Sequence, residues 1–173
     1  MIKIDKPNEG EYAPYAIMYI SLLPDDGDVI SHLRNNLAAV KSFIVSLPGE
    51  KLTYRYAPDK WTIKEVLVHV MDTERIFAYR ALRFARNDKT ALPGYEQNDY
   101  VPYSRANDRS IDNIFREYSA VRVATLSLLE SLSGDDFLRS GIANGNPASV
   151  RALAYQIAGH ELHHMKIIKE RYL

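Results

Sequence analysis

The feature that most constrains the fold of this chain is a set of four long stretches in which apolar residues recur every three or four positions. These stretches cover about residues 28–47, 62–87, 110–132 and 149–173. No stretch alternates apolar and polar residues convincingly, which is the pattern of a half-buried strand. Each stretch therefore predicts a helix with one buried face, and together they predict an all-α four-helix bundle.

The segments between these helices differ in kind. Residues 1–27 hold three prolines and several tyrosines, and we expect an N-terminal arm that packs on the bundle, with one short helix near 14–22. Residues 88–108 form a polar connection of roughly 20 residues, an unusual length between helices. We expect it to be a long crossover between the second and third helices, ordered as a lid or pocket wall. A loop before the last helix is predicted by Gly141, Gly145 and Pro147.

Length and composition restrict the class of protein. A chain of 173 residues suits one domain over 1–173. Lys+Arg and Asp+Glu both number 22, so the formal net charge is zero, which argues against a nucleic-acid partner. No apolar run reaches the ~18 residues of a membrane span, and the N-terminus lacks the apolar core of a signal peptide, so we expect a cytoplasmic protein. The absence of cysteine excludes disulfides and thiolate metal ligands.

Three histidines give the strongest indication of function. His160 and His164 are four residues apart in the last predicted helix, so they lie ~40° apart on one helix face, one turn from each other. His69 lies in the second predicted helix. On a helical projection all three point inward, among aliphatic positions, whereas His163 falls at the flank. Two ligands from one helix and a third from a neighbour would leave a coordination position free, which is the arrangement of a catalytic metal site.

The alternative interpretation is that each histidine is an ordinary core residue that has found a hydrogen-bond partner. For a single inward histidine this is the more common case. Three buried imidazoles would need several partners, because a buried polar group without one is costly. We therefore expect a shared divalent metal ion held by His69, His160 and His164.

Charged residues near His69 suggest further roles. Asp72, or Glu65, could hold a metal-bound imidazole by its far nitrogen, and Arg80 could bind an anionic group of a substrate. The alternative is that these residues form helix-edge salt bridges. Lid or pocket residues in the long connection could be Tyr95, Glu96, Asp99, Tyr100 and Tyr103.

Residues 160–164 also match H-E-x-x-H, the helix signature of zinc metalloproteases, in which the glutamate activates water. Those enzymes take a third ligand downstream of the motif, but only nine residues follow His164 and none is a histidine. A peptidase is therefore disfavoured. Glu161 could still act as a general base, or it could pair with a neighbouring helix.

The chain resembles the DinB/YfiT-like metalloenzyme superfamily, and more closely its DinB-like four-helix domain branch. The resemblance covers nearly the whole chain, and its motifs are specific in combination. The matching segments are YRYAP at 54–58, WTIKEVLVH at 61–69, DTERIFAYRALR at 72–83, LPGY at 92–95, SVRALAY at 149–155 and IAGHELHH at 157–164.

The resemblance implies a four-helix bundle with a long crossover and one divalent metal ion per chain, nickel or zinc, held by His69, His160 and His164. It implies that the protein is a homodimer. Some relatives transfer a low-molecular-weight thiol such as bacillithiol, and others are described as metal-dependent hydrolases. We therefore expect an enzyme that activates a water or such a thiol cosubstrate for attack on a small-molecule substrate. The alternative is a non-catalytic stress-response protein in which the metal staples the bundle.

Overall fold

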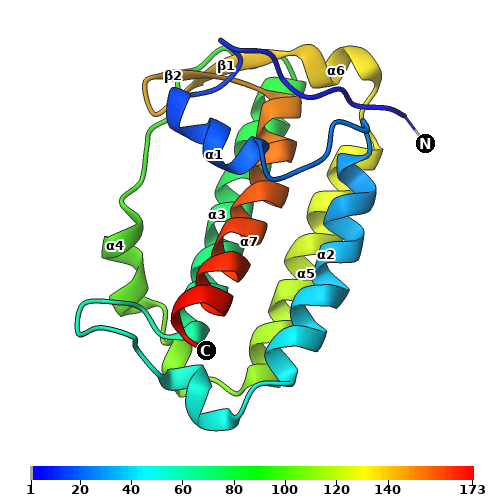
Figure 1. Ribbon diagram of the computed structural model, residues 1–173. Coiled ribbons are helices and arrows are strands. Elements are labelled where there is room, and N and C mark those ends of the chain that lie inside the picture. Colours follow the sequence, from blue (N-terminus) through cyan, green and yellow to red (C-terminus); the bar gives the residue numbers. More distant parts are fainter. Residues whose placement is uncertain (1) are drawn as a thin grey trace.

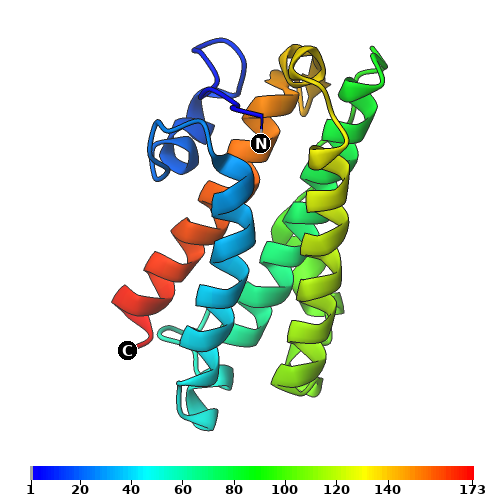
Figure 2. The same ribbon diagram turned by 90° about the vertical axis from the view of Figure 1, so that its right-hand side faces the viewer.

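A computed structural model describes residues 2–173 of the chain. Four long helices dominate it, as predicted: α2 (Val29–Val45), α3 (Ile63–Ala85), α5 (Ile111–Glu130) and α7 (Val150–Arg171). They lie side by side as a bundle, which Figures 1 and 2 show from two directions. The prediction of a four-helix bundle is confirmed.

Side chains that precede the helices fix where three of them begin. Thr62 accepts a hydrogen bond from the backbone N–H of Glu65, and the Glu65 carboxylate accepts one from the Thr62 N–H, which together form a capping box. Ser110 and Ser149 accept equivalent bonds before α5 and α7. These contacts satisfy backbone donors that the first helical turn leaves free.

The long crossover joins two neighbouring helices, α3 and α5, that run in the same direction. In the bundle α2 packs against α5 and α7, and α3 also packs against α5 and α7. After α3 the chain returns along the outside of the bundle before α5 begins, so that α3 and α5 run in the same direction (Figure 1). This connection contains three short helical turns that the sequence pattern did not predict: α4 (Gln97–Tyr100), η3 (Val101–Tyr103) and η4 (Ala106–Asp108).

A two-stranded hairpin replaces the loop that we predicted before the last helix. Strands β1 (Ser140–Ala143) and β2 (Asn146–Ser149) pair antiparallel, with Ala143 opposite Asn146. The two residues between them, Asn144 and Gly145, both have positive φ, as a type I′ turn requires. Asn-Gly is itself the strongest short hairpin signal. The strands have only four residues each, too few for a clear period-two pattern.

The N-terminal arm covers the upper part of α7. Its helical part consists of η1 (Pro14–Ala16) and α1 (Ile17–Ile20), within the predicted range. Helix α1 packs against α7, and Gly159 makes this contact possible. A Cβ atom at Gly159 would lie 2.2 Å from the backbone oxygen of Tyr19.

Polar residues divide the core into two apolar clusters. One cluster includes Phe84 of α3 and Leu153 of α7, and the other includes Leu67 of α3 and Ile168 of α7. Buried polar and charged side chains lie between these two regions of α3 and α7. They are His69, Thr73, Glu74, His160 and Glu161.

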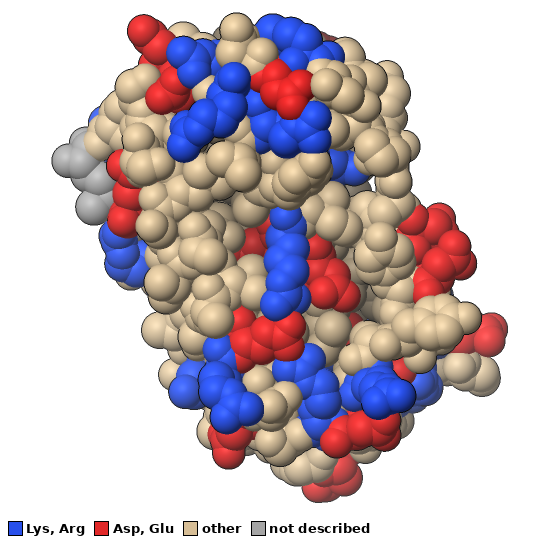
Figure 3. All heavy atoms as spheres, turned by 180° about the vertical axis from the view of Figure 1, so that it is seen from behind, with Lys and Arg blue, Asp and Glu red and all other residues tan. Residues whose placement is uncertain are grey.

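The surface mixes both signs of charge. From behind, Lys and Arg side chains alternate with Asp and Glu, with uncharged residues between them (Figure 3). Within residues 2–173, none of the helices is both long enough and apolar enough to span a membrane.

The close approach at Gly159 gives a test of how the arm packs. We expect Gly159→Ala to lower the free energy of unfolding by about 1–3 kcal/mol, the cost of overpacking, although alanine favours the helix. The control is Gly49→Ala, because a Cβ atom at Gly49 meets nothing within 4 Å. Chemical denaturation measures both variants, and equal stability of the two would contradict the observed packing of α1 on α7.

Candidate metal centre

Three histidines from two neighbouring helices bring their Nε2 atoms together. His69 lies on α3, and His160 and His164 lie on successive turns of α7. The Nε2 atom of His160 is 3.0 Å from that of His69 and 3.1 Å from that of His164. No fourth histidine, cysteine or carboxylate joins this cluster within the described part of the chain. His163 lies outside it, with its ring edge-on to Tyr19.

The chemistry of these nitrogens fits a divalent metal. A neutral imidazole Nε2 carries either one N–H or one lone pair, so His160 can form a good hydrogen bond with only one of its two neighbours. Nitrogens bound about 2.0–2.1 Å from a single ion lie about 3.0–3.4 Å apart at near-tetrahedral angles. The observed spacing therefore suits three ligands of one ion better than three hydrogen-bonded imidazoles.

Burial keeps the three rings neutral. It lowers the pKa of His69 to about 4 and that of His164 to about 3. Burial, with the neighbouring imidazoles, holds the pKa of His160 well below its usual range. Near neutral pH all three rings can therefore offer lone pairs to a metal ion without first losing a proton.

A cavity of about 320 Å³, here called the arginine compartment, opens beside His160. Its lining comes from η1 and α1 of the arm, from α3 and α7, from the start of the crossover and from the turn of the hairpin. The lining residues are Tyr15, Tyr19, Thr73, Phe77, Arg80, Tyr95, Glu96, Gln97, Asn144 and His160. The histidine cluster is thus accessible from a cavity that the distant segments complete only after folding.

Arg80 is the main charged group on the inner wall of the arginine compartment. Its side chain is buried, and it donates a hydrogen bond of 2.9 Å to the backbone oxygen of Pro93. Unlike the buried Arg122 and Arg151, it forms no ion pair with any carboxylate of residues 2–173. A buried guanidinium without a counterion favours an anionic ligand.

Two tyrosines place hydroxyl groups in the same compartment. Tyr95 and Thr73 hydrogen-bond through their hydroxyl oxygens at 2.6 Å. Tyr19 packs edge-on against His160, with 5.3 Å between ring centroids. Burial raises the pKa of both tyrosines, so both phenols stay neutral and can donate hydrogen bonds to a ligand.

A second cavity, of about 210 Å³, lies beside His164 and is here called the aromatic compartment. It lies between α7, the start of α3, the segment that precedes α3 and α4 of the crossover. Its lining residues are Tyr56, Asp59, Lys60, Trp61, Val66, Asn98, His164, Ile167 and Tyr172. Trp61 also packs on His69, with 4.7 Å between ring centroids.

The carboxylates predicted to support a histidine have other partners. Asp72 pairs with Arg75 at 3.4 Å, and burial raises its pKa. Glu65 caps α3 and also accepts hydrogen bonds from Arg55 and Asn107. The alternative interpretation of helix-edge salt bridges describes both residues, since neither is bonded to a histidine.

Glu161 lies in a buried network with side chains of α5. Both of its oxygens contact the guanidinium of Arg122, at 2.9 and 3.4 Å, and it accepts a hydrogen bond from the Tyr118 hydroxyl. Arg122 also donates two hydrogen bonds of 2.9 Å to Glu74. Burial opposes the charge of Arg122, but Glu161 and Glu74 raise its pKa above the ordinary value. Glu161 is therefore fully engaged with a neighbouring helix.

The sequence interpretation missed several residues near the cluster. It gave neither Trp61 nor Tyr19 a role at the site. Arg122 was not singled out, although an arginine at an inward position of an amphipathic helix needs a buried counterion and was a usable signal.

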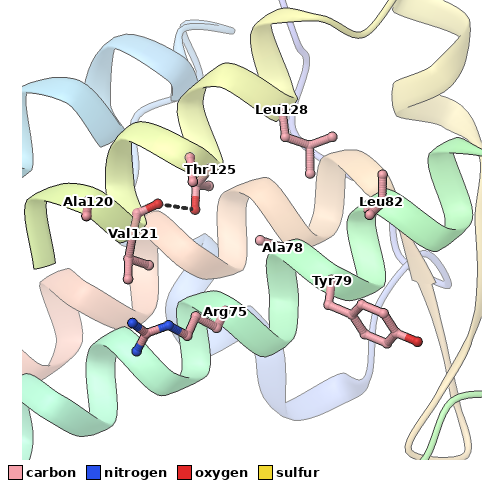
Figure 4. A pocket seen from close by; sticks show the side chains of 9 residues that line it. Arg75, Ala78, Tyr79, Leu82, Ala120, Val121, Thr125 and Leu128 are labelled. Carbon is pink, nitrogen blue, oxygen red and sulfur yellow. Dashed lines mark hydrogen bonds between the residues drawn. The ribbon is translucent and has the colours of Figure 1, made fainter. Parts of the chain in front are cut away.

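A third pocket, of about 500 Å³, lies away from the histidines on the outer side of α3 and α5. Figure 4 shows that Ala78, Tyr79 and Leu82 of α3 face it across from Val121 and Leu128 of α5. Its lining is mostly apolar and contains no histidine and no carboxylate.

Comparisons with known proteins agree with this description. A sequence profile of the DinB superfamily matches residues 32–168. A protein of Geobacillus thermodenitrificans (strain NG80-2), provisionally named a metal-dependent hydrolase, is 24% identical over 139 residues, which cover 78% of this chain and 77% of that protein. The structure of YfiT from Bacillus subtilis, described as a provisionally assigned metal-dependent hydrolase with an unusual four-helix bundle topology, superposes with a TM-score of 0.72. That match is 16% identical and covers 96% of this chain and 91% of YfiT.

The cluster predicts which histidines are required for metal binding. We expect the purified protein to bind about one divalent ion per chain, and His69→Ala, His160→Ala or His164→Ala each to weaken binding at least tenfold, because each removes one nitrogen ligand. His163→Ala is the matched control and should bind like the wild type. Calorimetric titration with Zn²⁺ and Ni²⁺ measures this. Loss of binding in His163→Ala alone would contradict the assignment.

The lowered pKa values predict how the metal-free protein responds to acid. Below pH 6.5 the unfolded chain protonates these histidines while the folded chain keeps them neutral, so stability falls as the pH drops from 6.5 toward about 4. Three such groups should lower the free energy of unfolding by about 4 kcal/mol between pH 7 and 5.5. Urea denaturation of the chelator-treated protein measures this, and His69→Asn should show a shallower slope. A flat profile over this interval would contradict neutral burial.

Proposed function

Because the chain belongs to the DinB superfamily, we propose that it is a metal-dependent hydrolase that acts on a small molecule with an anionic group. The observation that carries this proposal is the convergence of three neutral imidazole nitrogens beside a cavity. That cavity is lined by Arg80, which has no ion pair with a carboxylate of residues 2–173. The names given to the Geobacillus protein and to YfiT support hydrolysis as the type of reaction.

His69, His160 and His164 would hold the ion. Nickel and zinc are the proposed metals, and three imidazoles accept either. When bound, a divalent ion lowers the pKa of a water molecule or a thiol and so supplies a nucleophile near neutral pH. No carboxylate belongs to the cluster among residues 2–173.

The side chains of the arginine compartment would bind and orient the substrate. Arg80 would pair with its anionic group, and the hydroxyls of Tyr19 and Tyr95 would donate hydrogen bonds to its polar atoms. The rings of Tyr19 and Phe77 would exclude bulk water from the space next to His160, since both line the cavity there. Exclusion of water strengthens each of these polar contacts.

A second candidate is transfer of a low-molecular-weight thiol to a small electrophile. Two features favour it: the chain has no cysteine, so a thiol must arrive from outside, and the buried cation of Arg80 suits an acidic thiol such as bacillithiol. The non-catalytic alternative, in which the metal only stabilises the packing of the helices, is less well supported because a cavity reaches His160.

The proposal predicts a specific effect of Arg80. Arg80→Gln should raise KM for a carboxylate-bearing ester about ten- to a hundredfold, because a charge-assisted contact contributes about 1.5–3 kcal/mol, and should leave metal content unchanged. The control is Arg83→Gln on the same helix, since Arg83 pairs with Asp88 on the surface.

The assay incubates metal-loaded protein with small esters and amides, with and without an added thiol, and with peptides. Neutral analogues of each anionic substrate should show no difference between Arg80→Gln and wild type. Turnover that requires the thiol would select the transfer reaction. Turnover of peptides alone would contradict both candidates and favour the protease motif of residues 160–164.

A further inference from the structure

The histidine cluster is flanked by two cavities of different chemistry, and the proposed function uses only one of them. His160 faces the arginine compartment and His164 faces the aromatic compartment. Each cavity is at or below the lower end of the ~300–1,000 Å³ that a whole small-molecule ligand occupies. A ligand bound in one cavity alone would leave the other cavity, beside the other of the cluster's two α7 histidines, without a ligand group.

Three aromatic rings form the wall of the aromatic compartment. Trp61 lies directly against His69, whose ring centroid is 4.8 Å from that of His164. Tyr172 packs edge-on to Tyr56, with 4.9 Å between centroids. The Tyr172 hydroxyl donates to the backbone oxygen of Trp61 at 2.5 Å, which ties the Tyr172 ring to the main chain at Trp61.

The compartment offers apolar contact and no net charge. Val66 and Ile167 add aliphatic surface, and the exposed Asp59 and Lys60 supply one charge of each sign. Burial raises the pKa of Tyr172 to about 12, so its phenol is neutral. Rings arranged edge-on around an apolar space favour another planar ring, which gains edge-to-face contacts beyond simple burial.

We propose that the aromatic compartment is a second binding subsite of the histidine cluster and takes a neutral planar ring. Together with Arg80, it would select a substrate that carries an anionic group at one end and a planar ring at the other, with the reactive bond beside the cluster. The substrate part of this inference rests on the proposed function, whereas binding of the ring can be measured without any turnover.

The chain provides its own reporter for this subsite. Trp61 is the only tryptophan of the sequence, so ¹⁵N-labelled protein gives a single indole N–H cross-peak in NMR. We would titrate zinc-loaded protein with benzyl alcohol as the planar neutral probe. Cyclohexylmethanol is the matched non-planar probe, and inorganic phosphate is the anionic one.

Benzyl alcohol should shift the Trp61 indole peak saturably and bind more tightly than cyclohexylmethanol, and phosphate should leave that peak unmoved. Tyr56→Ala should weaken benzyl alcohol binding about two- to tenfold, the range expected for one aromatic pair. Tyr54→Ala is the control, because Tyr54 is a neighbouring exposed tyrosine that does not line the compartment.

The outcomes separate this inference from the proposed function. Binding of benzyl alcohol at Trp61 without turnover of any ester, amide or thiol substrate would support the subsite and overturn the proposed function. Equal shifts with both alcohols, no shift with either, or equal affinity in Tyr56→Ala and Tyr54→Ala would overturn the subsite, whatever the activity. A full set of dispersed NMR peaks shows that each variant is folded.

Discussion

A single buried guanidinium connects all four helices of the bundle. Arg122 of α5 is fully buried, binds Glu74 of α3 and Glu161 of α7, and donates a 2.5 Å hydrogen bond to the backbone oxygen of Leu33 in α2. The loss of one member of such a network leaves a buried charge unpaired, which costs about 3–5 kcal/mol. These directional contacts oppose sliding of each helix along its neighbours. Apolar packing opposes such sliding less, because it is not directional.

The metal cluster depends on that alignment because its ligands come from two of the connected helices. His69 lies five residues before Glu74 on α3, and His160 is the direct neighbour of Glu161 on α7. A shift of either helix by one turn would move its histidines by about 5.4 Å, more than the 3.0–3.1 Å that separates their Nε2 atoms. The charged network thus connects the two helices that carry the histidines, at positions close to them in the sequence.

The four long helices form only part of the arginine compartment. The arginine compartment needs α1 from the arm, Tyr95 from the crossover and Asn144 from the hairpin turn. The close contact of α1 is possible because Gly159 has no side chain at the place where the backbone of Tyr19 passes. These segments are far apart in the sequence, and the crossover and the hairpin are joined directly by backbone hydrogen bonds at Leu92.

The sequence by itself determined the four helices, their starts and the inward direction of three histidines. Helical periodicity and the Thr62–Glu65 capping box are local, so they can be read from neighbouring residues. The partners of Glu161 and the two cavities were decided only by the tertiary structure. They depend on which surfaces meet across the bundle, and the position of Glu161 next to His160 does not reveal that Arg122 will reach it from another helix.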